Sequence, residues 1–164
     1  MPSSTVAKNF RDGLLEVFDG TGSPISMTAT LENGDFSLSG LTSGQKETSV
    51  YLDRGDFATI RHTNQAFPTV SLSAHMAYLS DGSAGSFVDL IRKTGQFASA
   101  VSPLGANAEL MAYRLILTIE GTDHGDSADH QISLDDVVLS VDFSEGDPNS
   151  FSLSGTVYGA IALT

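Results

Sequence analysis

Residues 26–39 carry the clearest secondary-structure signal in the chain: Ser26-Met27-Thr28-Ala29-Thr30-Leu31-Glu32-Asn33-Gly34-Asp35-Phe36-Ser37-Leu38-Ser39. Two runs in which apolar and polar residues alternate flank the dipeptide Asn33-Gly34. Asn-Gly favours a type I′ turn, because both central residues of that turn need a positive φ angle. The sequence therefore predicts a β-hairpin over residues 26–39.

The alternation within this stretch sorts its side chains onto two faces, because successive residues of a strand point to opposite sides. The face expected to join a core carries Met27, Ala29, Leu31, Phe36 and Leu38. The opposite face, polar and without positive charge, carries Thr28, Thr30, Glu32, Asp35, Ser37 and Ser39.

Working outward, the composition is that of one globular domain spanning residues 1–164, with 40% hydrophobic and 17% charged residues. Cysteine is absent, which excludes disulfides, thiolate metal sites and cysteine nucleophiles. The sequence has no apolar run of about 18 residues and no signal-peptide pattern, so we expect no transmembrane helix, no membrane insertion and no signal peptide. The lack of cysteine also fits assembly in a reducing cytoplasm.

The charge is strongly acidic, with a formal net charge of −12, and every basic residue lies at or before Arg114. An acidic surface repels phosphates, so we expect no tight binding of nucleic acid. Two interpretations stay open at this point. The acidity either simply keeps the protein in solution, or it serves to repel a polyanion that passes close to it.

Strand patterns dominate the remaining chain and predict a mainly β fold of seven or eight strands, as a β-sandwich or squashed barrel. One flanking α-helix is expected at about residues 86–94, with Ser86 as N-cap and Gly95 as the stop. Residues 57–61 fit either a short strand or a helical turn. We also expect an N-terminal arm over about residues 1–12 and an apolar C-terminal end at 161–164. The other predicted strands cover 14–18, 47–52, 69–79, 113–120, 132–143 and 151–162.

No pattern in the sequence indicates catalysis. Residues 121–130 contain two histidines and three aspartates, but their spacing matches neither an EF-hand nor a structural zinc site, which favours an ordinary polar loop. No nucleophile elbow is present, and adjacent carboxylates at Asp135-Asp136 would point to opposite faces of a strand. Arg54-Gly55-Asp56 is interpreted as a turn. We therefore predict no enzymatic activity, no catalytic residues, no cofactor and no bound metal.

Several short motifs, in this order along the chain, resemble those of the tail tube proteins (major tail proteins) of long, non-contractile-tailed bacteriophages. The resemblance also includes the Asn33-Gly34 turn and the single helix. The motifs that carry it are Lys8-Asn9-Phe10-Arg11-Asp12-Gly13, Asp19-Gly20-Thr21-Gly22, Leu52-Asp53-Arg54-Gly55, Glu120-Gly121-Thr122-Asp123-His124-Gly125-Asp126 and Asp142-Phe143-Ser144-Glu145-Gly146-Asp147-Pro148-Asn149.

The resemblance implies a β-sandwich with one flanking helix, assembled into hexameric rings that stack into a hollow tube. Terminal arms and a long loop would reach the adjacent ring. The tube would conduct viral DNA during ejection without binding it tightly. Expected partners are other copies of the chain, the tape measure protein and the tail terminator or distal tail proteins. The expected location is the virion, after assembly in the host cytoplasm.

Two residue sets follow from this resemblance and from the polar faces. We expect the lumen of the tube to be lined by Thr28, Thr30, Glu32, Asp35, Ser37, Ser39, Asp136 and Asp142. We expect contacts between subunits or rings at Phe10, Arg11, Arg54, Arg61, Arg92, Lys93 and Leu163.

Three alternatives remain. A monomeric β-sandwich that binds a sugar or a host protein would usually show clustered aromatic residues, and this sequence has no Trp and only four Tyr. A related tail component, such as a terminator or distal ring protein, fits the same motifs. An enzyme on a β scaffold is the third alternative, and the sequence offers it no constellation of catalytic residues.

Overall fold

The structure, a computed structural model, describes residues 13–29, 36–41, 45–76, 79, 86–122, 125 and 127–164. Within these residues the chain forms an eight-stranded antiparallel sheet, a separate two-stranded sheet and one α-helix. This confirms the prediction of a mainly β fold with a single flanking helix.

The elements follow one another along the chain, with the longest connection between Phe97 and Tyr113. In order they are β1 (Gly13–Phe18), β2 (Ser26–Ala29), β3 (Ser37–Ser39), β4 (Lys46–Asp53), β5 (Asp56–Gln65), β6 (Thr69–His75), α1 (Phe87–Arg92), the 3-10 turn η2 (Gly95–Phe97), β7 (Tyr113–Ile119), β8 (His130–Ser144), β9 (Ser150–Val157) and β10 (Ile161–Leu163).

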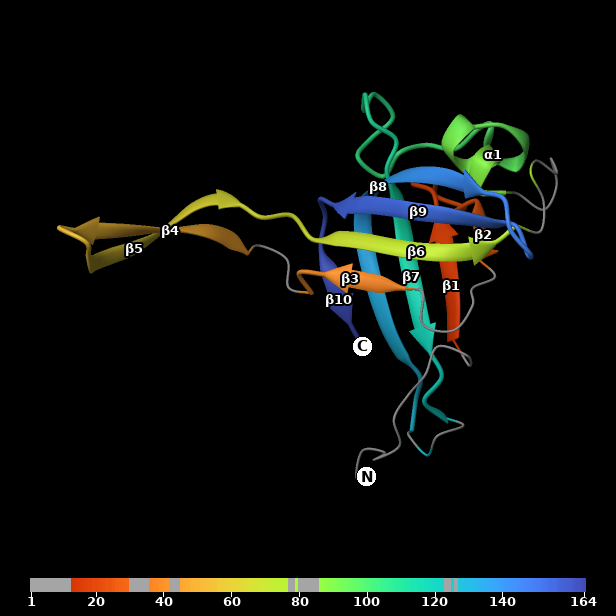
Figure 1. Cartoon of the computed structure of the whole chain (residues 1–164). Coiled ribbons are helices and arrows are strands. Elements are labelled where there is room, and N and C mark those ends of the chain that lie inside the picture. Colours follow the sequence, from red (N-terminus) through yellow and green to blue (C-terminus); the bar gives the residue numbers. More distant parts are fainter. Residues whose placement is uncertain are drawn as a thin grey trace.

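The large sheet folds into two layers because β8 changes partners along its length. The first part of β8 pairs with β7 and β10, and the part from Val137 onward pairs with β9. Between Leu134 and Val137 the register against β7 gains one residue, which is a β-bulge, and Asp136 lies there at φ 53°. A bulge bends its strand and increases its twist. One layer thus holds β2, β1, β7 and β10, while the other, running across it, holds β9, β6 and β3 (Figure 1).

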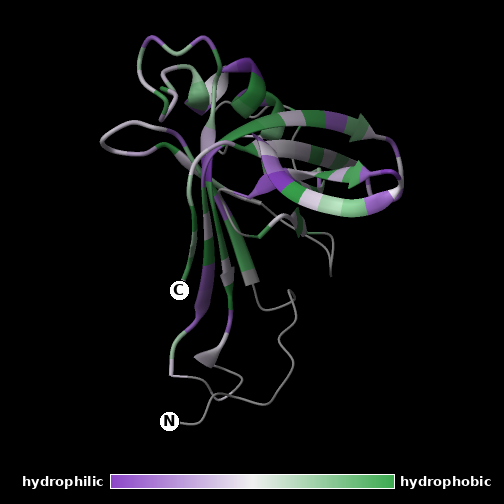
Figure 2. Cartoon of the chain, turned by 90° about the vertical axis from the view of Figure 1, so that its left-hand side faces the viewer, coloured by the Kyte–Doolittle hydropathy of each residue, from purple (hydrophilic) through white to green (hydrophobic). Residues whose placement is uncertain are grey.

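The core lies between these layers and is lined by the inward side chains of both. Leu15 and Val17 of β1, Leu115 of β7 and Val137 of β8 are among its fully buried members. Along the strands these apolar residues alternate with hydrophilic ones, as the interleaved colours of Figure 2 show. The alternation places one face of each layer in the core and leaves the other face outside.

Helix α1 closes one end of the sandwich, as expected of a helix too short to be stable alone. The Ser86 side chain caps it by accepting a hydrogen bond from the backbone N–H of Asp89, as predicted. Phe87 packs edge-on against Phe151 of β9, with ring centroids 6.2 Å apart. The helix ends earlier than the sequence predicted. Lys93, at φ 53°, is the C-cap, whereas Gly95 begins the following 3-10 turn.

The predicted hairpin over residues 26–39 is wrong in its pairing. Strands β2 and β3 both exist, but β2 pairs with β1 and β3 pairs with β6, at opposite ends of the strand order. Residues 30–35, which contain Asn33-Gly34, lie outside the described residues. Each strand instead has a partner more distant in the sequence: Met27 joins the core beside Val17 of β1, and Leu38 packs against the core beside Val70 of β6.

Two other predicted strands also differ from the structure. The single strand expected over 151–162 is broken into β9 and β10. The break falls at Gly159, where an added Cβ would lie only 2.7 Å from the carbonyl oxygen of Asp135. Residues 57–61 belong to a strand, not to a helical turn, and that strand, β5, extends to Gln65.

Strands β4 and β5 form a hairpin that projects away from the two-layered body (Figure 1). Its turn is Arg54-Gly55, with φ angles of 53° and 94°, which is the type I′ geometry. At its root, the backbone N–H of Ala66 donates to the carbonyl of Gln45 at 2.8 Å. No helix in the described part of the chain is long and apolar enough to span a membrane.

Candidate functional site

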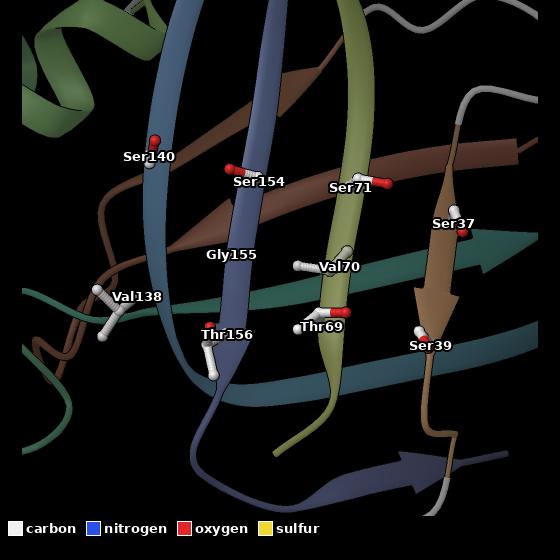
Figure 3. A pocket seen from close by; sticks show the side chains of 10 residues that line it. All are labelled: Ser37, Ser39, Thr69, Val70, Ser71, Val138, Ser140, Ser154, Gly155 and Thr156. Atoms are coloured by element: carbon white, nitrogen blue, oxygen red, sulfur yellow. The ribbon is translucent and has the colours of Figure 1, made fainter. Parts of the chain in front are cut away.

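The outward face of β3, β6, β9 and the second part of β8 is covered by small hydroxyl side chains. Because these strands pair in register, the hydroxyls form rows across the sheet: Ser37, Ser71, Ser154 and Ser140 make one such row (Figure 3). The acidic side chain of this face is Asp142, opposite Ser152. We call this the hydroxyl face, and it consists of Ser37, Ser39, Thr69, Ser71, Ser73, Ser140, Asp142, Ser152, Ser154 and Thr156.

The hydroxyl face is hollowed into two open, adjoining grooves of about 410 Å³ and about 300 Å³. Most of its side chains are exposed and none of them is basic. Small hydroxyls can form hydrogen bonds with water or a passing chain, yet they offer neither a deep pocket nor fixed cations for a phosphate to bind. The hydroxyl face therefore has the chemistry of a surface that does not bind a passing chain tightly, rather than that of a binding site.

The β4–β5 hairpin carries the second notable surface. Val50 lies opposite Ile60 and Leu52 lies opposite Phe57, with a β-bulge in β5 between the two pairs, so all four side chains share one side of the hairpin. They are 54–66% exposed, although such residues are usually buried. We call them the apolar hairpin face. The reverse side is more polar, with Ser49 opposite Arg61 and Tyr51 opposite Thr59.

This hairpin lacks support from the body of the protein. Every residue of β5 is exposed, and in β4 only Ser49 is partly covered. A two-stranded hairpin alone in water is only marginally stable. A continuous apolar surface exposed to water is typical of a protein–protein contact. The apolar hairpin face is therefore a surface that needs a partner.

The polar loop before β8 is held closed by its own backbone. The Asp129 carboxylate accepts hydrogen bonds from the N–H groups of Gly121 and Thr122, at 3.1 and 3.2 Å. These bonds, that of Gly121 first, hold the pKa of Asp129 below its usual value. Among the described residues, no three His, Cys, Asp or Glu side chains gather where a metal ion could bind. Residues 123, 124 and 126 of this loop lie outside the described residues.

The residues expected to line a lumen do not share one surface. Ser37, Ser39 and Asp142 lie together on the hydroxyl face. Thr28 does not, because β2 belongs to the other layer, where Thr28 lies opposite Glu16. Asp136 lies at the bulge of β8, beside the end of that face. Thr30, Glu32 and Asp35 lie outside the described residues.

Of the residues expected at subunit contacts, Arg54 and Arg61 both belong to the projecting hairpin. Arg92 and Lys93 form the exposed end of α1. Leu163 is 56% exposed on β10, but that strand pairs with β8 of its own chain. Phe10 and Arg11 lie outside the described residues. Whether these residues touch a second subunit stays a prediction.

Sequence reasoning missed the apolar hairpin face, although the signal was present. Val50 and Leu52 alternate with polar residues on one side of Arg54-Gly55, and Phe57 and Ile60 follow it on the other. An alternating run followed by a two-residue turn with glycine indicates a hairpin and gives the apolar side of β4. Phe57 and Ile60 are three residues apart, so they join that side only through the β-bulge opposite Tyr51 and Leu52, which the sequence does not reveal.

Comparisons with known proteins bear on the fold. No protein-family model and no curated protein matches the chain. Among solved structures, the chain is similar to one described as the cryo-EM structure of the anti-feeding prophage (AFP) baseplate, 6-fold symmetrised, with a TM-score of 0.51 and 10% sequence identity. The match covers 100% of this chain and 97% of that chain. At such low identity the likeness establishes the fold: the whole chain has the architecture of a chain found in a phage-tail-like baseplate.

Proposed function

We propose that this chain is a structural, non-enzymatic subunit of a phage tail or phage-tail-like particle, in which it assembles with further copies of itself into stacked rings. The observation that carries the proposal is the apolar hairpin face, which projects away from the two-layered body (Figure 1). Val50, Leu52, Phe57 and Ile60 are more than half exposed in one chain alone. Contact with a neighbouring subunit would remove them from water.

The likeness to a chain of a 6-fold symmetrised baseplate supports an assembly of this kind, since it covers nearly all of both chains. The motifs that resemble tail tube proteins favour the tube over other tail parts. In this proposal the rings are hexameric, and the protein acts as part of the phage tail or phage-tail-like particle.

The hydroxyl face is proposed as the wall of the lumen. DNA or a polypeptide sliding through a tube needs a surface that does not hold it, and each basic contact with a phosphate would add affinity. Small hydroxyls with one carboxylate, Asp142, provide such a surface. This revises the expected lumen, because Thr28 of the other layer is left out of it.

Negative-stain electron microscopy of the purified full chain tests the assembly. We expect rings or tubes for the wild type, and monomers for the double variant Leu52→Ser, Phe57→Ser. The matched control is Tyr51→Ser, on the reverse side of the hairpin, which should still assemble. A wild-type chain that stays monomeric at every concentration would overturn the proposal and favour a monomeric binding module.

Single-cysteine variants test whether the hydroxyl face lines the lumen, because the natural sequence contains no cysteine. In assembled tubes, Ser154→Cys on the hydroxyl face should be shielded from a maleimide attached to a large polymer, while Thr28→Cys should react. In the unassembled chain both should react. The reverse pattern in tubes would place the other layer at the lumen.

A further inference from the structure

The hydroxyl face ends, near the root of the hairpin, in a row of larger side chains. Two residues beyond the last pairs of β3, β6 and β9 lie Leu41, Phe67 and Tyr158, with Gly40 at φ 80° between β3 and Leu41. The rings of Phe67 and Tyr158 are in contact, with centroids 4.9 Å apart and planes tilted by 53°. All three side chains are 44–47% exposed. We call them the aromatic row.

An acidic group borders this row. The backbone N–H of Tyr158 donates to the carbonyl of Asp136 at 3.1 Å, so the bulge of β8 lies next to the ring. Its neighbour Asp135 is already paired with Arg114, at 3.1 Å. Asp136 has no ion-pair partner among the described residues. The aromatic row is thus an apolar surface with a carboxylate, that of Asp136, near its edge.

The tip of the hairpin cannot reach the aromatic row of its own chain. The hairpin leads away from the body (Figure 1), and Leu52 is the seventh residue of β4. At about 3.3 Å per residue, Leu52 lies roughly 20 Å along the strand from its root. Leu52 and Phe57 can therefore meet an aromatic row only on a different molecule.

Charge favours a second copy of this chain as that molecule. Residues 46–65 contain three basic and three acidic residues, which leaves the whole net charge of −12 on the remainder. Two bodies of this charge repel one another, whereas the neutral hairpin can approach without that penalty. Arg54, at the turn beside Leu52 and Phe57, also complements Asp136 beside Tyr158.

We propose that the apolar hairpin face of one copy packs on the aromatic row of the next, with Arg54 placed over Asp136. This deepens the proposed function and rests on its premise of self-assembly. The two surfaces differ, so the contact is heterologous and each copy offers one of each kind. Contacts of this type produce closed rings or open helical stacks rather than closed dimers.

Disulfide trapping tests the pairing. Leu52→Cys chains mixed with Tyr158→Cys chains should form cross-linked dimers on oxidation, well above the yield of either variant alone. The matched control is Leu52→Cys mixed with Phe143→Cys, because Phe143 is also an exposed aromatic residue, at 53%, but lies near the opposite end of the same layer. This mixture should give no excess of dimers.

Association measured by sedimentation gives a second readout. We expect Tyr158→Ser to weaken association roughly thirtyfold, as for an aromatic residue at an interface hot spot. Arg54→Ala should weaken it up to about fivefold, as for a charge at the rim. Cross-links from Leu52 to Phe143 or to a second Leu52, with none to Tyr158, would overturn the pairing but leave assembly through the hairpin intact. A chain that never associates would overturn both.

Discussion

Replacing Gly55 with alanine should open the β4–β5 hairpin without affecting the body. Gly55 has φ 94° and an added Cβ would meet no atom within 4 Å, so the substitution acts through backbone conformation alone. Holding an L-residue in the left-handed region costs about 1–2 kcal/mol. The neighbouring Arg54 already lies at φ 53°, so the turn has no other residue to absorb the change. A cost of this size shifts the closed-to-open equilibrium of the hairpin about five- to thirtyfold toward the open form.

The loss of stability should be confined to the hairpin, because the hairpin residues make little packing contact with the body. Hydrogen exchange on the unassembled chain measures this, since exchange reports local opening. Protection of the amides that donate hydrogen bonds between β4 and β5 should fall by that factor. Protection of Leu117, buried in β7, should stay the same.

Gly22→Ala is the matched control, since an added Cβ there also meets nothing within 4 Å, and Gly22 has no positive φ. That variant should change neither the hairpin nor the body. The reasoning is refuted if Gly55→Ala leaves the protection of β4 and β5 unchanged. It is refuted as well if protection at Leu117 falls in parallel, because the hairpin would then be part of the same cooperative unit as the core.

Two further predictions concern the body. Gly155→Ala should lower the melting temperature, because the new Cβ would lie 2.9 Å from Leu139 Cδ2 and 3.0 Å from the Val138 carbonyl oxygen; overpacking of this kind costs roughly 1–3 kcal/mol, at about 2–4 °C per kcal/mol. Burial, with a smaller effect from the Asp19 carboxylate, raises the pKa of Tyr113 from 10.0 to about 12. The folded state therefore holds a proton that the unfolded state releases, so this contribution is complete below pH 10 and is lost as the pH rises toward 12. Melting curves between about pH 8 and 11.5 should show a steeper loss for the wild type than for Tyr113→Phe, and equal slopes would contradict the assignment.

Much of the strand content could be predicted from the sequence, because alternation is a local property. The runs around Val17, Leu72, Leu117 and Leu139 each became a strand with those side chains turned inward. Ser86 likewise acted as the N-cap that its position before an apolar stripe indicated. Such signals depend on residues only a few positions apart, so a single sequence displays them directly.

Pairing between strands could not be predicted in the same way. Asn33-Gly34 favours a local hairpin, but β2 and β3 gain more from distant partners, β1 and β6. The bulge at Asp136 was also hidden, since an aspartate in the left-handed region leaves no pattern in its neighbours. That bulge sends β8 from one layer to the other. It thereby separates Thr28 from Ser37, which a simple hairpin would have placed on one face.

In the proposed function, folding and assembly rest on two different parts of the chain. The body has its own hydrophobic core between two layers, so we expect it to fold as a single molecule. The hairpin keeps its apolar face exposed, so we expect binding of a second copy to stabilise it by mass action. Stability of the hairpin should therefore rise with protein concentration while that of the core stays nearly constant. A subunit built this way stays folded before it assembles, and substitutions such as Leu52→Ser can remove assembly without removing the fold.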